Sequence, residues 1–211
     1  MTTADLGFTH RFVPSSGAAG ITLLLLHGTG GNEDDLIPLG RELLPGAALL
    51  SPRGRILENG MPRFFRRLAE GVFDQEDLKR QTAELARFID GASRKYGIEN
   101  DRIVAVGYSN GANIAASLLL THPDVLAGAA LFRPMVPFRP QTPPKLTDVP
   151  VLLAAGRSDG IVPAEQTSAL AEILRVAGAD VSIHWHAGGH ELGQDDLTSA
   201  SNWLARWGGA R

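Results

Sequence analysis

An apolar run that ends in a serine between two glycines constrains the fold of this chain more than any other feature. Residues 104–107 read Val-Ala-Val-Gly and have strand character, and the small residues that follow suit a helix that begins at once. So tight a turn from strand to helix strains the backbone of Ser109 and pushes its Oγ out above the sheet edge. A side chain at Gly107 or Gly111 would collide with the neighbouring strand or helix. We therefore predict that Ser109 is a nucleophile.

Short apolar runs of strand character alternate with helical patterns along the whole chain. This alternation predicts an α/β fold, in which a mostly parallel central sheet carries helices on both faces. The expected strands are 21–26, 47–50, 103–106, 128–131, 151–155 and 181–185, with a weak edge strand at 8–13, and the expected helices are 74–96, 112–121, 163–177 and 195–207. Functional loops of such sheets lie at the carboxyl ends of the strands. His27, Ser109, Asp159 and His190 all come directly after expected strands.

Composition excludes several classes of function. The 211 residues suffice for one domain with a substantial core, so we expect a single domain over 1–211. The absence of cysteine excludes disulfides, thiolate metal sites and a cysteine nucleophile. A net charge of −3 gives no electrostatic reason to expect nucleic acid as a partner. The longest apolar run is too short to span a bilayer and the first twelve residues hold no continuous apolar region, so we expect no membrane insertion and a cytoplasmic location.

A serine hydroxyl needs a base to take its proton and a carboxylate to orient that base. On a turn of this kind the three groups follow in the chain order serine, acid, histidine. Asp159 lies a few residues beyond the strand at 151–155 and is the candidate acid, whereas Asp124 and Asp148 lie at the entrance of a helix or strand. Among the six histidines, His190 lies in a Gly-Gly-His-Glu loop from which an imidazole could reach the serine. We predict Asp159 and His190 as the partners of Ser109.

The oxyanion that forms during attack on a carbonyl needs backbone donors. One donor is expected to be the N–H of Asn110, and the other the N–H of Thr29 in the glycine-rich loop after the first central strand. His27 opens this loop and is expected to fix its shape by local hydrogen bonds. The alternative reading of the loop, a phosphate cradle, lacks the lysine of a P-loop and the spacing of a dinucleotide fingerprint. The sequence implies no metal and no organic cofactor.

The chain resembles α/β-hydrolases of the carboxylesterase, lysophospholipase and acyl-protein thioesterase family in four motifs: Leu-Leu-His-Gly-Thr-Gly-Gly-Asn, Gly-Tyr-Ser-Asn-Gly-Ala-Asn, Gly-Arg-Ser-Asp and Gly-Gly-His. The stretch 58–67 resembles a bacterial branch of carboxylesterases and hydroquinone-linked hydrolases. The resemblance implies an α/β-hydrolase fold and a triad of Ser109, Asp159 and His190, in agreement with the residues themselves. The related dienelactone hydrolases use a cysteine nucleophile, which this chain lacks.

The stretch 53–67 combines five arginines with Met61, Phe64 and Phe65 and admits two interpretations. Its apolar side chains could wall an acyl or aromatic pocket, with an arginine facing a polar end of the substrate. Alternatively, the aromatic rings belong to the core and the arginines are solvated or paired with nearby Glu70, Asp74 and Glu76.

The segment 132–150 holds six prolines, which block helix interiors, so a helical lid cannot form there. We expect an open cleft, walled in part by Met135 and Val136, that accepts small carboxylic esters and hydrolyses them through an acyl-enzyme. A lysophospholipase or an acyl thioesterase could use the same triad, and a non-catalytic binding protein could use the same fold. A homodimer is left open by the sequence.

Overall fold

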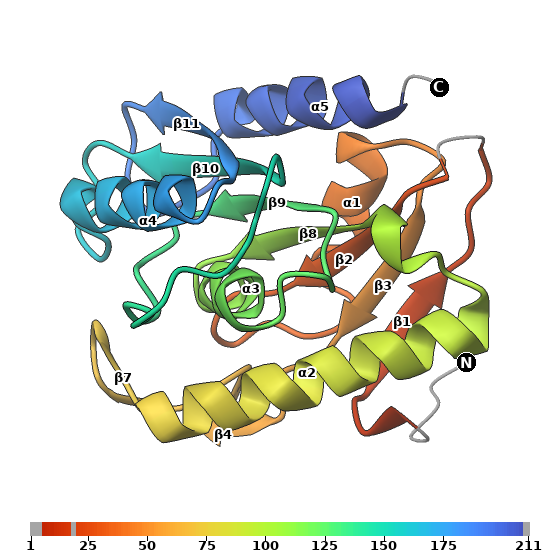
Figure 1. Cartoon of the computed structure of the whole chain (residues 1–211), viewed down its shortest axis with the longest axis horizontal. Coiled ribbons are helices and arrows are strands. Elements are labelled where there is room, and N and C mark those ends of the chain that lie inside the picture. The colour runs from red at the N-terminus through yellow and green to blue at the C-terminus, as the bar shows by residue number, and fades with distance from the viewer. Residues whose placement is uncertain (1–5, 18–19, 209–211) are drawn as a thin grey trace.

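The computed structural model describes residues 6–17 and 20–208. The expectation drawn from the first twelve residues therefore falls in part on residues 1–5, which lie outside the described residues. Seven strands form one sheet in the order β1-β3-β2-β8-β9-β10-β11 (Figure 1). They are β1 (His10–Val13), β2 (Thr22–Leu26), β3 (Ala48–Pro52), β8 (Ile103–Tyr108), β9 (Gly128–Phe132), β10 (Pro150–Gly156) and β11 (Asp180–His186). Edge strand β1 pairs antiparallel with β3, and the other pairings of this sheet are parallel.

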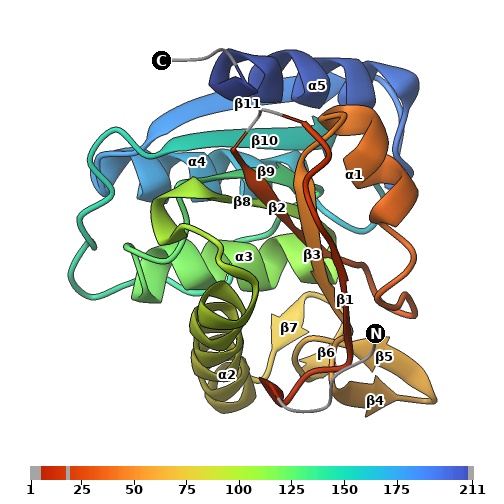
Figure 2. The same ribbon diagram turned by 90° about the vertical axis from the view of Figure 1, so that its right-hand side faces the viewer.

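Helices cover both faces of the sheet (Figure 2). They are α1 (Ile37–Leu43), α2 (Gln75–Tyr96), α3 (Asn110–Thr121), α4 (Ala164–Val176) and α5 (Gln194–Gly208), with a short 3-10 helix at Asn100–Arg102. Buried side chains of α2, α3 and α4 belong to one core cluster, and those of α1 and α5 belong to a second cluster on the opposite face. The central strands supply both clusters because successive side chains of a strand point to opposite faces. In β2, for example, Leu24 joins the first cluster and Leu25 the second.

This architecture confirms the predicted mostly parallel α/β sheet, and every predicted strand and helix is present within a few residues of its expected limits. Helix α2 begins after Asp74, whose carboxylate accepts a hydrogen bond from Asp77 N, and it ends at Gly97 in the left-handed conformation (φ 67°). An aspartate whose side chain caps the N-terminus and a left-handed glycine at the C-terminus are common ends of helices. Within the described part of the chain, no helix is both long and apolar enough to cross a membrane.

The unassigned stretch before α2 forms two short hairpins, β4 (Ile56–Glu58) with β5 (Met61–Arg63) and β6 (Arg67–Ala69) with β7 (Val72–Phe73). The β6–β7 hairpin lies on the side of the molecule to which the arrows of β8, β9 and β10 point (Figure 1). Residues 133–149, between β9 and β10, contain no helix. The carboxyl edge of the sheet is therefore bordered by hairpins and an irregular loop.

Candidate active site

Ser109 lies in the sharp turn between β8 and α3, with φ 52° and ψ −112°. This strained conformation is held by hydrogen bonds on both sides: Ser109 N donates to Phe132 O at 2.9 Å, and Asn113 N donates to Ser109 O at 3.0 Å. A Cβ at Gly111 would lie 1.9 Å from Leu26 O, and one at Gly107 would lie 2.7 Å from Gly111 O. Both glycines are thus needed for the close approach of α3 to the sheet, as the sequence predicts.

A chain of hydrogen bonds joins three side chains from three different loops. His190 Nε2 lies 3.1 Å from Ser109 Oγ, and His190 Nδ1 lies 2.8 Å from Asp159 Oδ2. The other carboxylate oxygen of Asp159 accepts from Ile161 N at 2.8 Å and from Val162 N at 2.9 Å. The Asp159 side chain is 1% exposed and that of His190 is 17% exposed. The structure therefore brings the three predicted side chains together in the order serine, imidazole, carboxylate.

The environment of Asp159 favours its charged form. Burial alone would raise the pKa of this carboxyl, but hydrogen bonds from the N–H groups of Val162 and Ile161 and from His190 outweigh burial and lower the pKa below its ordinary value. Asp159 is therefore ionised at neutral pH. An ionised carboxylate can hold the Nδ1–H tautomer of His190 and stabilise an imidazolium at that position.

The glycine-rich loop after β2 is fixed by His27. The buried ring donates from Nδ1 to Gly28 O at 2.6 Å and accepts from Gly54 N at Nε2 at 2.9 Å. These two bonds require the neutral ring, and burial lowers the pKa of His27. Further along the loop, Gly30 N donates to Pro62 O at 2.9 Å, and the Arg63 guanidinium donates to Thr29 Oγ1 at 2.7 Å. The loop is therefore bonded to the segment that follows β3 and to β5.

The two expected oxyanion donors both carry available backbone N–H groups. Neither Thr29 N nor Asn110 N has a hydrogen-bond acceptor among the residues that the structure describes. Asn110 is the first residue of α3, where an N–H has no partner within the helix. Its side chain accepts from Phe64 N at 2.7 Å, and that of Asn113 accepts from Met135 N at 2.7 Å. The first turn of α3 thus anchors both segments that border the site.

Of the five residues predicted to contact substrate, Met61 and Val136 lie at or near the surface, and the other three are buried. Met61 is 40% exposed, and its sulfur approaches Gly30 of the glycine-rich loop. Val136 is half-buried, and Met135 is 9% exposed. The suggestion that Phe64 and Phe65 wall an open pocket is wrong for this structure, because they are 1% and 0% exposed and belong to the core cluster with α2 and α3. Their rings are apolar enough to be drawn into that core instead.

All five arginines of this stretch are ion-paired, as the second interpretation allows, but only Asp74 among their partners was expected. Arg53 contacts Glu33, Arg55 contacts Glu84, Arg66 contacts Asp74, and both Arg63 and Arg67 contact Glu58. Sequence reasoning missed a different arginine, Arg133, which is fully buried beside the His190 loop. The available signal was a charged residue placed two positions after the expected apolar strand at 128–131.

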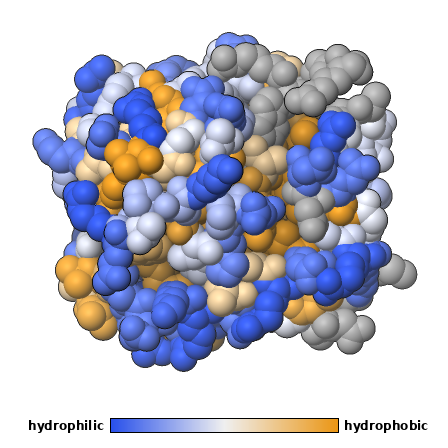
Figure 3. Space-filling model, viewed as in Figure 1, coloured by the Kyte–Doolittle hydropathy of each residue, from blue (hydrophilic) through white to orange (hydrophobic). Residues whose placement is uncertain are grey.

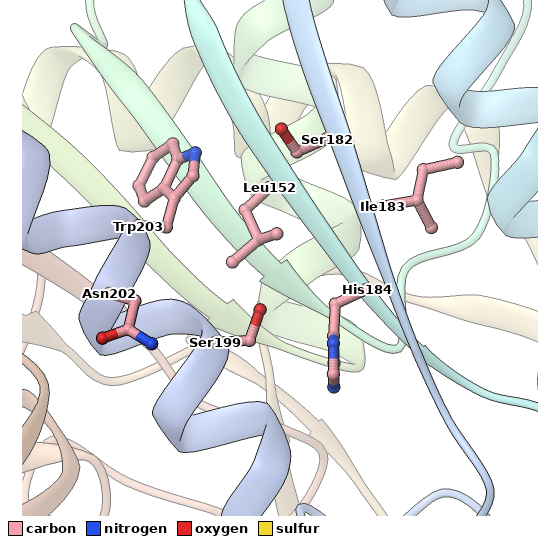
Figure 4. Close-up of a pocket in the computed structure, with 7 residues that line it drawn as sticks. All are labelled: Leu152, Ser182, Ile183, His184, Ser199, Asn202 and Trp203. Atoms are coloured by element: carbon pink, nitrogen blue, oxygen red, sulfur yellow. The ribbon is translucent and has the colours of Figure 1, made fainter.

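A separate pocket of about 460 Å³ lies between β11 and α5 (Figure 4). Leu152, His184, Asn202 and Trp203 are among its lining residues, and none of the predicted site residues lines it. His184 Nε2 has no hydrogen-bond partner in the described part of the chain, although carboxylate oxygens of Asp195 and Asp196 lie 3.8 Å away. The pocket is therefore distinct from the site at Ser109.

Comparisons with known proteins place the chain among hydrolases of the same fold. The model of the phospholipase/carboxylesterase family matches residues 10–208. A protein of Bacillus subtilis (strain 168), named as the hydrolase MhqD, is 50% identical over 193 residues, which are 92% of this chain and 96% of that protein. The crystal structure of a Bacillus cereus carboxylesterase is 46% identical with a TM-score of 0.92, covering 95% of this chain and 94% of that one. The Mesorhizobium loti carboxylesterase structure is 34% identical with a TM-score of 0.92, covering 97% and 98%.

Proposed function

Because the chain belongs to the phospholipase/carboxylesterase family, we propose that it is a serine esterase that hydrolyses small carboxylic esters through an acyl-enzyme. The observation that carries this proposal is the unbroken hydrogen-bond chain from Ser109 Oγ through His190 to Asp159. In serine hydrolases of unrelated folds, a serine, a histidine and a carboxylate are joined by hydrogen bonds in the same way.

In the first half of the reaction, Ser109 Oγ attacks the ester carbonyl carbon while His190 Nε2 takes the serine proton. Asp159 accepts from His190 Nδ1–H and stabilises the imidazolium that forms. The imidazolium then returns its proton to the leaving alcohol, and the acyl group stays on Ser109. In the second half, His190 takes a proton from water, the hydroxide attacks the acyl carbon, and Ser109 regains its proton as the acid leaves.

The negative oxygen of each tetrahedral intermediate is stabilised by Thr29 N–H and Asn110 N–H. Two observations support these donors: both N–H groups lack an acceptor in the described chain, and Asn110 begins helix α3, whose dipole favours negative charge at that end. The bonds that His27 and Arg63 make hold the Thr29 loop in one shape. A preformed pair of donors needs no rearrangement when charge develops.

The expected substrates are small because the carboxyl edge of the sheet carries no helical lid. The bordering hairpins offer apolar surface: Leu68 is 70% exposed and Val72 is 51% exposed. In Figure 3, apolar side chains gather at the corner where the β6–β7 hairpin lies in Figure 1. A cytoplasmic location and a homodimer stay predictions, to be tested by fractionation and by sedimentation.

A panel of nitrophenyl esters and acyl thioesters of increasing chain length tests this proposal. The wild type is expected to prefer short acyl esters and to gain no rate at the critical micelle concentration of longer ones. Ser109→Ala is expected to lose turnover, while Ser201→Ala, a serine on α5 bonded to Leu43 O, retains it. An optimum at long chains would favour the lysophospholipase alternative, and an optimum for thioesters the thioesterase alternative. A folded wild type without turnover of any member would favour a non-catalytic binding protein.

A further inference from the structure

Arg133 occupies an unusual place for a charged residue. It follows β9 directly, its side chain is 0% exposed, and its backbone is left-handed with φ 56°. Its N–H donates to Ala154 O of β10 at 2.7 Å, and the preceding carbonyl, Phe132 O, accepts from Ser109 N. The backbone of Arg133 therefore lies between the end of β9, which is bonded to the Ser109 turn, and β10, which leads to Asp159.

The guanidinium of Arg133 reaches the loop that carries His190. Its Nε donates to Gly189 O at 3.1 Å, and one terminal nitrogen donates to Glu191 O at 2.5 Å. Between them, His190 O accepts from the Tyr108 hydroxyl at 3.1 Å. Three consecutive carbonyls of the loop, centred on His190, are thus held by side chains whose backbones flank the Ser109 turn.

Further contacts fix the guanidinium itself. Both carboxylate oxygens of Asp196 accept from it, at 3.1 Å and 2.7 Å, and this ion pair is 0% exposed on both sides. His186 Nε2 lies 2.6 Å from the same group, and Ala154 O accepts at 3.2 Å. By residue type, His186, Asp195 and Asp196 could hold a metal ion. Here the guanidinium already uses His186 Nε2 and both oxygens of Asp196, so the cluster serves to hold an arginine.

We propose that Arg133 is a positioning residue for the hydrolytic reaction, which keeps His190 Nε2 within hydrogen-bond distance of Ser109 Oγ. The loop begins with two glycines, Gly188 and Gly189, whose backbone adopts many conformations when it is not held. Arg133 restricts it from both sides of His190, while Asp196 and His186 keep the planar group in one orientation. This role rests on the proposed function, since it has an effect on rate only if His190 is the base.

Arg133→Lys tests this role because lysine keeps the positive charge beside Asp196 but lacks the planar fork. One ammonium group cannot reach five partner residues that lie around a guanidinium. We expect kcat for a short nitrophenyl ester to fall about 100-fold with KM nearly unchanged, which is the scale of loss for a misplacement of roughly 1 Å. The rate of fluorophosphonate labelling at Ser109 is expected to fall in parallel, and the low-field NMR signal of His190 Nδ1–H to shift or broaden.

Leu85→Ala is the matched control, since Leu85 is a fully buried core residue of α2 outside the site. It should lower the melting temperature without changing the labelling rate, which separates lost stability from lost positioning. If the Arg133→Lys protein does not fold, Asp196→Asn is the test variant instead. Its kcat is expected to fall less, because one oxygen acceptor for the guanidinium remains. A folded variant labelled within twofold of the wild-type rate would overturn the role of Arg133. A wild type that is not labelled at Ser109 would instead overturn the proposed function.

Discussion

The carboxyl edge of the sheet and the neighbouring hairpin segment, residues 56–73, are in contact but are built differently. At the strand ends, Ser109 and His190 are held by hydrogen bonds with other elements, and Asp159 is held by N–H groups of its own loop. In the hairpins the strands are two or three residues long, and several apolar side chains are exposed. Contacts such as Gly30 N to Pro62 O join the two regions, but each hairpin stays a separate two-stranded sheet.

The two regions meet different requirements: the strand ends must support the chemical reaction, and the hairpins affect which substrate is preferred. Proton transfer needs a donor atom and an acceptor atom within about 3 Å of each other. The side chains at the strand ends must therefore be held in one position. A short hairpin with exposed apolar residues can change in sequence without moving the sheet. We therefore expect substitutions at the strand ends to remove folding or activity, and substitutions on the hairpin surface to change which ester is preferred.

The largest contrast is expected between two glycines. Gly111→Ala would place a Cβ 1.9 Å from Leu26 O, so the variant is expected not to fold. Gly60, in the β4–β5 turn, has nothing within 4 Å of a built Cβ, and Gly60→Ala should cost only the roughly 1 kcal/mol of a left-handed backbone. Soluble yield and thermal unfolding followed by circular dichroism distinguish the two. Equal stability of the two variants would contradict the close approach of α3 to β2.

Asp159→Asn is expected to lower kcat/KM on the order of a thousandfold, because an amide cannot hold the Nδ1–H tautomer of His190 as a carboxylate does. Glu70→Gln, at the turn of the β6–β7 hairpin, changes an exposed carboxylate in the same way and is expected to leave the rate within about twofold of wild type, the range of a surface substitution. Steady-state kinetics on a short ester measures both. Nearly full activity in Asp159→Asn would mean that another carboxylate is the partner of His190.

A third comparison lies within the hairpin segment itself. Phe65 is 0% exposed and packs against Phe73 with ring centroids 5.1 Å apart, so Phe65→Ala is expected to lower the free energy of unfolding by about 3–5 kcal/mol. Leu68 is 70% exposed, and Leu68→Ala should change that free energy by less than about 0.5 kcal/mol. Urea unfolding gives both values. Similar losses in the two variants would show that the segment is not divided into core and surface as described.

The smallest effect concerns pH. Burial lowers the pKa of His27 below the ordinary histidine value of 6.5, so the folded protein binds this proton less readily than the unfolded chain does. His27 therefore contributes its full stability above about pH 6.5, and that contribution is lost as pH falls from 6.5 toward the folded pKa, by up to about 1.4 kcal/mol per pH unit. The hairpin segment contains no histidine. Urea unfolding at pH 7 and pH 5.5 should give a smaller difference for His27→Gln than for wild type, and an equal difference would contradict the buried neutral ring.

The sequence predicted those parts of the molecule that local chemistry determines. Gly107 and Gly111 around Ser109 identify a turn because no other residue fits there, and Asp74 and Gly97 mark the ends of α2 because each satisfies a helix terminus. The hairpins were not predicted, since strands of two or three residues are too short to show a period. The burial of Phe64 and Phe65 depends on packing against α2, the next helix in the chain, and against α3, which lies much further along it.

Arg133 marks a different limit of sequence reasoning. Its side chain contacts Ala154, His186, Gly189, Glu191 and Asp196, which belong to the strand end before Asp159, the end of β11, the His190 loop and α5. None of these segments shows by itself that it will meet an arginine. Only the assembled sheet brings them to one point, so a lone arginine after an apolar strand reads as a surface residue.

The central claim is that Ser109 carries the acyl group, and trapping that intermediate tests it most directly. Wild-type protein is mixed with nitrophenyl acetate, quenched in acid within milliseconds to seconds, digested and mapped by mass spectrometry. We predict one acetyl group on the peptide that contains Ser109, formed together with a burst of nitrophenolate, and no such adduct in Ser109→Ala. Continued turnover with no adduct at Ser109, or with the acetyl group on another residue, would contradict the account.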